Sequence, residues 1–203
     1  MELEQKLELA AALELPHLEA SSEQWRKVAA KMKRVFVEPR KAAVLLLVSG
    51  CGRVLLTKRS ETLDHHRGQV ALPGGVSDPE DSSLEATALR EAQEEVGIDP
   101  SRVRVIGRLP GFSTFTGFEV QPILGHAQGA ASTIALSLNP HEIETAFWTE
   151  LDELSRSYRL EGVRLGPIEV PTHAFYVGGH RVWGATGLIL RDFLNRLDLV
   201  KAT

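Results

Sequence analysis

A glycine pair followed by a glutamate-rich helix is the feature that most constrains this chain. Pro73-Gly74-Gly75 precedes the segment Arg90-Glu91-Ala92-Gln93-Glu94-Glu95-Val96-Gly97-Ile98. At about 100° per residue, Glu91, Glu94 and Glu95 fall within an arc of about 100° on one helix. Carboxylates at this spacing repel each other, whereas Mg²⁺ or Mn²⁺ prefers oxygen ligands and turns the repulsion into attraction. The sequence therefore predicts a divalent cation site on one face of a helix.

The helix that carries these glutamates has clear start and stop signals. Ser82-Ser83-Leu84-Glu85 has the pattern of a capping box, and Gly97 can end the helix in the left-handed conformation. We expect the glutamates to lie at the edge of the core, partly shielded from water, with Arg90 paired to Glu94 four residues later. A solvated acidic face is the plain alternative, and the glycine lead-in argues against it. Apolar residues at helical spacing form the buried stripe: Leu84, Ala88, Leu89, Ala92 and Val96.

These residues resemble the Nudix box, the signature of the Nudix hydrolases. Its pattern is Gly, five residues, Glu, seven residues, then Arg-Glu-apolar-any-Glu-Glu-any-Gly-apolar. Gly75 supplies the first position, and Arg90 to Ile98 match the second half. Asp81 stands where the first glutamate is expected, and eight residues rather than seven separate it from Arg90. The resemblance implies a hydrolase that cleaves a diphosphate linkage with the help of Mg²⁺ or Mn²⁺.

A second motif upstream is similar to the signature of the coenzyme A diphosphatase branch of this family. That signature reads Leu-Leu-Thr-any-Arg-Ser, three residues, Arg, three residues, Gly, three residues, Phe-Pro-Gly-Gly. The chain has Leu55 to Ser60, Gly68 and Leu72 to Gly75 at the same spacing, with Asp64 in place of the arginine and Leu72 in place of the phenylalanine. The resemblance implies cleavage of coenzyme A or a derivative to 4′-phosphopantetheine and adenosine 3′,5′-bisphosphate. The candidate substrate-binding residues are Arg59, Ser60, Arg67, Gly68 and Gly74, and Arg67, His65 or His66 could take over the missing charge.

Hydrolysis of a diphosphate requires metal ligands and a catalytic base, and the sequence offers candidates for both. A doubly anionic diphosphate repels a nucleophile, so charge must be neutralised and a water placed in line. We expect Glu91 and Glu95 to be the principal metal ligands, with Glu94 as a further ligand or a base. The Gly75 carbonyl is a candidate ligand because glycine permits close approach of the backbone. The predicted catalytic set is Arg90, Glu91, Glu94, Glu95 and Glu142.

Glu142 is the first choice for a general base outside the helix, and Glu144 is the second. Both lie at the start of an expected strand, in Asn139-Pro140-His141-Glu142-Ile143-Glu144. An ordinary strand-end carboxylate is the alternative interpretation of either residue, and the sequence alone does not separate the two.

Bulk properties exclude some classes of partner. The net charge of −4 and the pI near 6.0 argue against nucleic acid held by bulk electrostatics. A single cysteine excludes an intramolecular disulfide framework and favours a reducing compartment. The chain has no apolar run of membrane-spanning length, and its N-terminus is acidic. We therefore predict a cytoplasmic protein with a small nucleoside diphosphate substrate, no nucleic acid and no membrane partner; a homodimer is left open.

The order of elements predicts the α/β class. Residues 1–38 are expected to form an N-terminal helical extension, with helices beginning near Leu3 and at 21–35. Residues 39–203 are expected to form one Nudix hydrolase domain, a Nudix-type α/β/α sandwich with a central mixed β-sheet. A polar loop is expected at 61–75, and a loop rich in Phe, Ser and Thr at 111–117. Strands are expected at 42–48, 54–56, 103–109, 118–126, 142–148, 168–170 and 174–177, with a helix starting at 151 and a final helix at 185–199.

Two rival functions stay open at this point. Within the same fold, the substrate could be another nucleoside diphosphate derivative, such as ADP-ribose or a dinucleotide. From a different class, the chain could be a ligand-binding module that has the fold without the chemistry. The intact Glu91, Glu94 and Glu95 argue against the second rival, because a pure binder does not need a repulsive carboxylate cluster.

Overall fold

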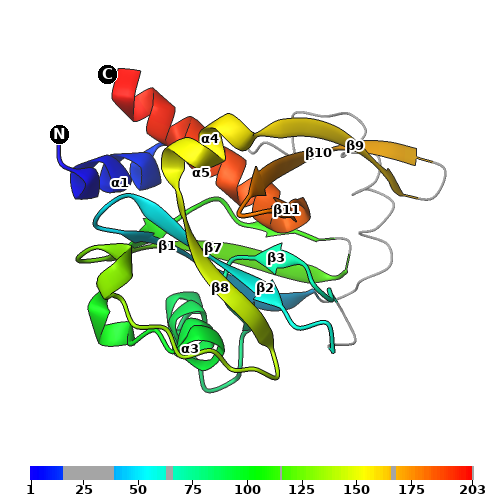
Figure 1. Cartoon of the computed structure of the whole chain (residues 1–203), viewed down its shortest axis with the longest axis horizontal. Coiled ribbons are helices and arrows are strands. Elements are labelled where there is room, and N and C mark those ends of the chain that lie inside the picture. The colour runs from blue at the N-terminus through cyan, green and yellow to red at the C-terminus, as the bar shows by residue number, and fades with distance from the viewer. Residues whose placement is uncertain (16–38, 63–65, 115, 166–167, 203) are drawn as a thin grey trace.

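The computed structural model describes residues 1–15, 39–62, 66–114, 116–165 and 168–202, and they form an α/β/α sandwich (Figure 1). A central sheet lies between helix α3 (Leu84–Val96) on one face and helices α1 (Leu3–Ala12) and α5 (Gly184–Ala202) on the other. This arrangement confirms the predicted fold class. The helix expected at 21–35 lies outside the described residues.

Within the described residues, the main sheet has eight strands and is mixed. Strand β1 (Arg40–Ser49) runs parallel to β7 (Phe118–Ala127), from Arg40 opposite Phe118 to Ser49 opposite Ala127. The other pairings are antiparallel, in the order β3-β2-β1-β7-β5 with β4, β6 and β8 branching from it. The remaining bounds are β2 (Arg53–Arg59), β3 (Val70–Ala71), β4 (Gly74–Val76), β5 (Val103–Arg108), β6 (Phe112–Ser113) and β8 (Ile143–Glu150).

Strands β1 and β2 separate after their hairpin, and the segment 70–76 enters the space between them. Its first part, β3, pairs with β2, and its last part, β4, pairs with β1. Gly74 makes this possible, because its φ is 152° and a Cβ there would lie 2.4 Å from the Ala43 carbonyl oxygen. The prediction of a plain loop over 61–75 is wrong in its second half, since two short strands form there.

Each face of the sheet has its own apolar core. On the α3 face, Ala88, Ala92 and Val96 are fully buried against Leu45 and Leu47 of β1. On the other face, α1 and α5 cover the sheet, and Leu7 and Ala10 of α1 belong to the same core as the residues of α5. The spacing of small apolar residues on α3 lets the helix approach the sheet closely, which sets the position of its polar edge.

The C-terminal part departs from the expected elements. The two strands predicted at 168–170 and 174–177 form one continuous strand, β10 (Ile168–Val177), in which Pro171 pairs with Gly162 of β9 (Arg159–Leu165). Neither β9 nor β11 (His180–Val182) was predicted, because β9 has no two adjacent apolar side chains and is interrupted by Gly162, and β11 has only three residues. Helix α4 (Leu151–Ser157) begins at the predicted residue.

A helix that crosses a bilayer needs both a minimum length and a predominantly apolar sequence. None of the helices in the described ranges combines the length and the apolar character of a membrane span.

Candidate active site

The residues that cap α3 fix where the helix begins and ends, and so fix the direction in which its glutamates point. Ser83, and not Ser82, is the N-cap: its hydroxyl oxygen accepts a hydrogen bond from the Ala86 N–H at 3.2 Å. The predicted capping box is therefore wrong by one residue, and Glu85 forms an ion pair with Arg108 instead. The C-terminus is as predicted, since Gly97 has a φ of 71° and donates its N–H to the Gln93 carbonyl at 2.9 Å.

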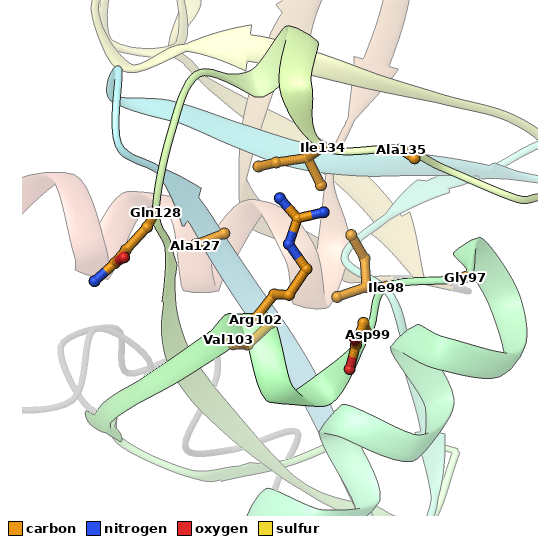
Figure 2. Close-up of a pocket in the computed structure, with 9 residues that line it drawn as sticks. All are labelled: Gly97, Ile98, Asp99, Arg102, Val103, Ala127, Gln128, Ile134 and Ala135. Atoms are coloured by element: carbon orange, nitrogen blue, oxygen red, sulfur yellow. The ribbon is translucent and has the colours of Figure 1, made fainter.

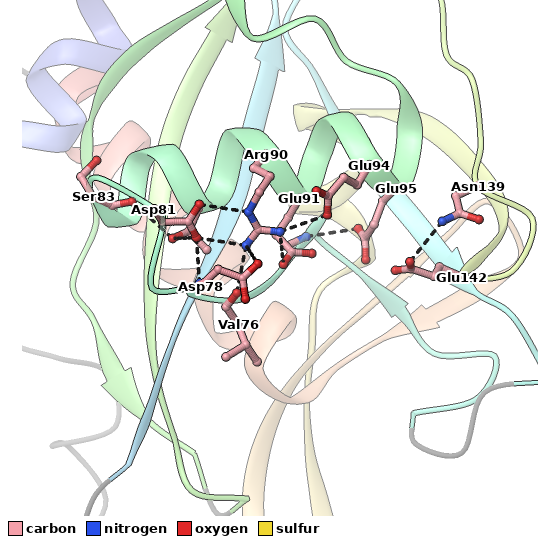
Figure 3. Close-up of polar contacts among 12 residues, drawn as sticks. Val76, Asp78, Asp81, Ser83, Arg90, Glu91, Glu94, Glu95, Asn139 and Glu142 are labelled. Atoms are coloured by element: carbon pink, nitrogen blue, oxygen red, sulfur yellow. Dashed lines mark hydrogen bonds and ion pairs between the residues drawn. The ribbon is translucent and has the colours of Figure 1, made fainter.

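Arg90 joins the start of α3 to its glutamates (Figure 3). Its Nε and Nη2 donate to the two carboxylate oxygens of Asp81, each at 3.0 Å. Its Nη1 donates to Glu91 at 2.9 Å and, as predicted, to Glu94 at 3.0 Å. Nη2 also donates to the Val76 carbonyl, at the end of the glycine strand β4. We name Arg90, Asp81, Glu91 and Glu94 the Arg90 cluster.

Asp81 is part of this arrangement despite the unusual spacing. The bidentate Arg90 guanidinium holds the pKa of Asp81 well below its ordinary value, helped by hydrogen bonds from the Asp78 N–H and the Thr87 hydroxyl. Asp81 is therefore ionised and fixes one side of Arg90. The sequence alone left the role of Asp81 open, although its position at the first acidic residue of the Nudix box pointed to a place in the site.

The three glutamates of α3 differ in their exposure to solvent. Glu94 has 54% of its side chain exposed, Glu91 has 15%, and Glu95 has 2%. The expectation of partial shielding is confirmed for Glu91 and Glu95 and is wrong for Glu94, which lies on the outer side of the helix. Burial raises the pKa of Glu91 in spite of the hydrogen bond from Arg90.

Glu95 is the most buried of these carboxylates and is held from two sides. One oxygen accepts from Arg59 Nη1 and the other from the Gly74 N–H, both at 3.2 Å. Burial nonetheless raises the pKa of Glu95 to about 8, because the nearby charges of Glu91 and Glu142 add to desolvation. Arg59, Gly74 and Glu95, which are far apart in the sequence, thus meet at one point.

Glu142 reaches this point from the loop before β8. The Asn139 N–H donates to the carbonyl of Glu95, and the Asn139 side chain donates to the Glu142 carboxylate at 3.1 Å. The Glu142 carbonyl accepts from the Ser60 N–H at 2.8 Å, next to Arg59. The charge of Glu142 raises the pKa of both Glu91 and Glu95, so its carboxylate lies close to theirs. Glu144 instead forms an ion pair with Lys58.

The other predicted substrate-binding residues lie in the segment between β2 and β3. The Ser60 hydroxyl is within 2.7 Å of the Thr62 hydroxyl, and the residue is buried. Arg67 and Gly68 lie in the turn before β3, where Arg67 is exposed and Gly68 has a φ of 62°. Asp64 and His65 lie outside the described residues.

The donor groups fit a hard divalent cation. Gly75, Glu91 and Glu95 offer only oxygen atoms, and Gly75 lies so close to Glu91 that a Cβ would be 2.5 Å from its carboxylate. In the described part of the chain, no three His, Cys, Asp or Glu side chains are already arranged as a metal cage. Arg59 and the Gly74 N–H occupy the two carboxylate oxygens of Glu95, so a cation bound there would have to replace the Arg59 contact. At Glu91, Arg90 donates to Oε1 alone.

A separate pocket of about 200 Å³ opens behind the C-terminal end of α3 (Figure 2). Arg102 extends into it between apolar side chains that include Ile98 and Ile134. No predicted site residue lines it.

Comparison with known proteins decides the family. Residues 38–166 match the sequence model described as the NUDIX domain. The chain belongs to the Nudix family. Membership of this family supports hydrolase activity for the chain. Nudix hydrolases generally use divalent metal ions and act on small nucleoside diphosphate substrates.

Curated relatives and solved structures agree with this assignment. A protein of Photorhabdus laumondii called uncharacterized Nudix hydrolase NudL is 38% identical over 172 residues, 82% of this chain and 90% of the relative. The protein of the same name from Citrobacter koseri is 41% identical, over 79% and 84% of the two chains. The MutT protein of Methanosarcina mazei Go1 is 22% identical with a TM-score of 0.51, covering 83% of this chain and 99% of that one, and this likeness shows the fold alone.

Replacing Glu95 with Gln should change the pH dependence of stability in a chelating buffer. An acid whose pKa rises on folding stabilises the fold fully below its unfolded pKa of 4.5, and this contribution is lost as the pH rises through the folded pKa of about 8. Glu95→Gln removes the ionisation, so its free energy of unfolding should exceed that of the wild type by about 5 kcal/mol well above pH 8 and by much less near pH 5. Urea denaturation across this pH range measures the difference.

Glu94→Gln is the matched control, because that side chain is exposed on the same helix. Parallel stability curves for wild type and Glu95→Gln at all pH values would contradict the burial of an ionisable Glu95.

Proposed function

We propose that this Nudix hydrolase is a Mg²⁺- or Mn²⁺-dependent diphosphatase of coenzyme A or a coenzyme A derivative, giving 4′-phosphopantetheine and adenosine 3′,5′-bisphosphate. The observation that carries the proposal is the contact of Arg59 with Glu95. It brings the upstream motif, which resembles that of the coenzyme A diphosphatases, against the most buried carboxylate of the Nudix helix.

The roles follow from burial and contacts. Glu91, Glu95 and the Gly75 carbonyl would hold the cation, which, when bound, neutralises phosphate charge and lowers the pKa of a water molecule. Glu94 is exposed, so it would serve as an outer ligand. Arg90 would orient Glu91 and Glu94, since it donates to both and is itself fixed by Asp81.

Glu142 would accept the proton of the attacking water. It stands beside the buried carboxylates and, unlike Glu144, forms none of the ion pairs identified among the described residues. The Asn139 side chain donates to only one oxygen of its carboxylate in these contacts. A base in this position can act from the edge of the cluster without being a principal ligand.

The substrate side of the proposal rests on positive charge and on glycine. Arg59 contacts Glu95, and the exposed Arg67 lies in the turn before β3, where it would bind a 3′-phosphate. Gly74 and Gly75 bring the backbone of β4 close to the carboxylates, so that a diphosphate can approach without obstruction by side chains. Gly68 and Ser60 would shape the turn on which these arginines depend.

A substrate comparison tests the proposed specificity. With Mg²⁺ or Mn²⁺ present, kcat/KM for coenzyme A should exceed that for its 3′-dephospho form and for ADP-ribose by about tenfold or more, because a 3′-phosphate adds a charge-assisted contact. Mass spectrometry identifies the two phosphate-containing products. A preference for ADP-ribose would overturn the substrate and would leave the diphosphatase chemistry in place.

Glu142→Gln tests the proposed base. The change keeps the size of the side chain and one acceptor oxygen for the Asn139 amide but removes the basicity, so kcat should fall by roughly 10²- to 10⁴-fold. Glu144→Gln, two residues along the chain, should change kcat by no more than about threefold, because its carboxylate pairs with Lys58 at the surface. Equal activities of the two variants would remove Glu142 from the mechanism.

A further inference from the structure

The ion pair between Arg59 and Glu95 is not explained by the proposed reaction. Glu95 is the carboxylate best placed to bind a cation, yet its Oε1 accepts a hydrogen bond from Arg59 Nη1 at 3.2 Å. A guanidinium and a divalent cation at one carboxylate compete for the same oxygen and repel each other. The Arg59 guanidinium therefore occupies the position at Glu95 that the proposed function assigns to a divalent cation.

Strand geometry aims Arg59 at this position. Side chains alternate along β2, and Leu55, four residues earlier, packs in the core beneath α3, so Arg59 points to the same face. A register shift in the pairing with β8 places Ile143 opposite Arg59. Glu144, which the shift passes over, contacts Lys58 and leaves Arg59 to Glu95.

The Arg59 side chain also has unused hydrogen-bonding capacity. Its Nε is buried and, among the described residues, has no hydrogen-bond partner. Only 27% of the side chain is exposed, so water does not readily compensate. A planar guanidinium with free donors matches the oxygen atoms of a phosphate.

We propose that Arg59 is an exchangeable counter-ion: it occupies the Glu95 carboxylate in the cation-free protein, and a divalent cation displaces it, releasing its guanidinium to the substrate diphosphate. The inference rests on the proposed function and deepens it, because it makes cation binding precede tight diphosphate binding. Arg59 thus acts as a positioning residue towards the cation and as a ligand towards the phosphate.

Manganese binding without nucleotide tests the first half. Free Mn²⁺ is measured by electron paramagnetic resonance under nitrogen at pH 8.5 with wild type, Arg59→Gln and Arg59→Lys. Arg59→Gln removes the competing charge, so it should bind Mn²⁺ about three- to tenfold more tightly. Arg59→Lys retains the charge and should stay closer to wild type. Arg53→Gln is the matched control, since Arg53 lies on the same strand and pairs with exposed Glu150.

Binding of α,β-methylene-ADP at saturating Mn²⁺ tests the second half by calorimetry. Here Arg59→Gln should weaken binding by about 10- to 100-fold, because a charge-assisted contact with phosphate is lost. Arg59→Lys should also weaken it, since lysine lacks the planar fork. Opposite changes in the two affinities are the signature of an exchanged counter-ion, whereas a merely structural arginine would weaken both.

The outcomes separate the inference from the proposed function. Equal or weaker Mn²⁺ binding by Arg59→Gln, with Mn²⁺ binding still lost in Glu95→Gln, would overturn the exchange and leave the cation site in place. Mn²⁺ binding that is the same in wild type and Glu95→Gln would overturn the cation site itself, and the exchange with it. In the Glu95→Gln background, Arg59→Gln should no longer tighten Mn²⁺ binding, because the competition has been removed.

Discussion

The contacts of Arg90 are the interaction on which the rest of the site depends. Five carboxylate or carbonyl contacts from one guanidinium connect the loop before α3, the glycine strand β4 and two helix glutamates. Without the Arg90 guanidinium as a shared partner, Glu91 and Glu94 would repel each other across one turn of the helix. Because Asp81 is ionised and fixes Arg90 from the opposite side, the guanidinium orients the glutamates rather than following them.

The second constraint is the close approach of β4 to β1 and α3. Gly74 permits it on one side, where the backbone of β1 leaves no space for a side chain, and Gly75 permits it on the other, next to the Glu91 carboxylate. The Gly74 N–H consequently reaches Glu95. The separation of β1 from β2 is thus a structural requirement of the site, since it admits the glycine strand to the sheet.

Some of this could be predicted from the sequence, where local rules decide. The apolar stripe of α3 and the Arg90–Glu94 pair follow from helical periodicity, and the end of the helix follows from the left-handed conformation of Gly97. The capping residue was misplaced because two serines are adjacent, and Glu85 found a distant partner in Arg108. The contact of Arg59 with Glu95 could not be predicted, because the two residues are 36 positions apart in the chain and only the sheet brings them together. The unequal burial of Glu94 and Glu95 likewise depends on what packs over the helix.

The central claim is that Glu91 and Glu95 are arranged to bind a divalent cation. Anomalous diffraction from a crystal soaked in Mn²⁺ tests it most directly. The account predicts a manganese peak at about 2.1–2.2 Å from oxygens of both carboxylates and near the Gly75 carbonyl, with Arg59 moved away from Glu95. No peak at this position, with Glu95 still paired to Arg59 at saturating Mn²⁺, would contradict it.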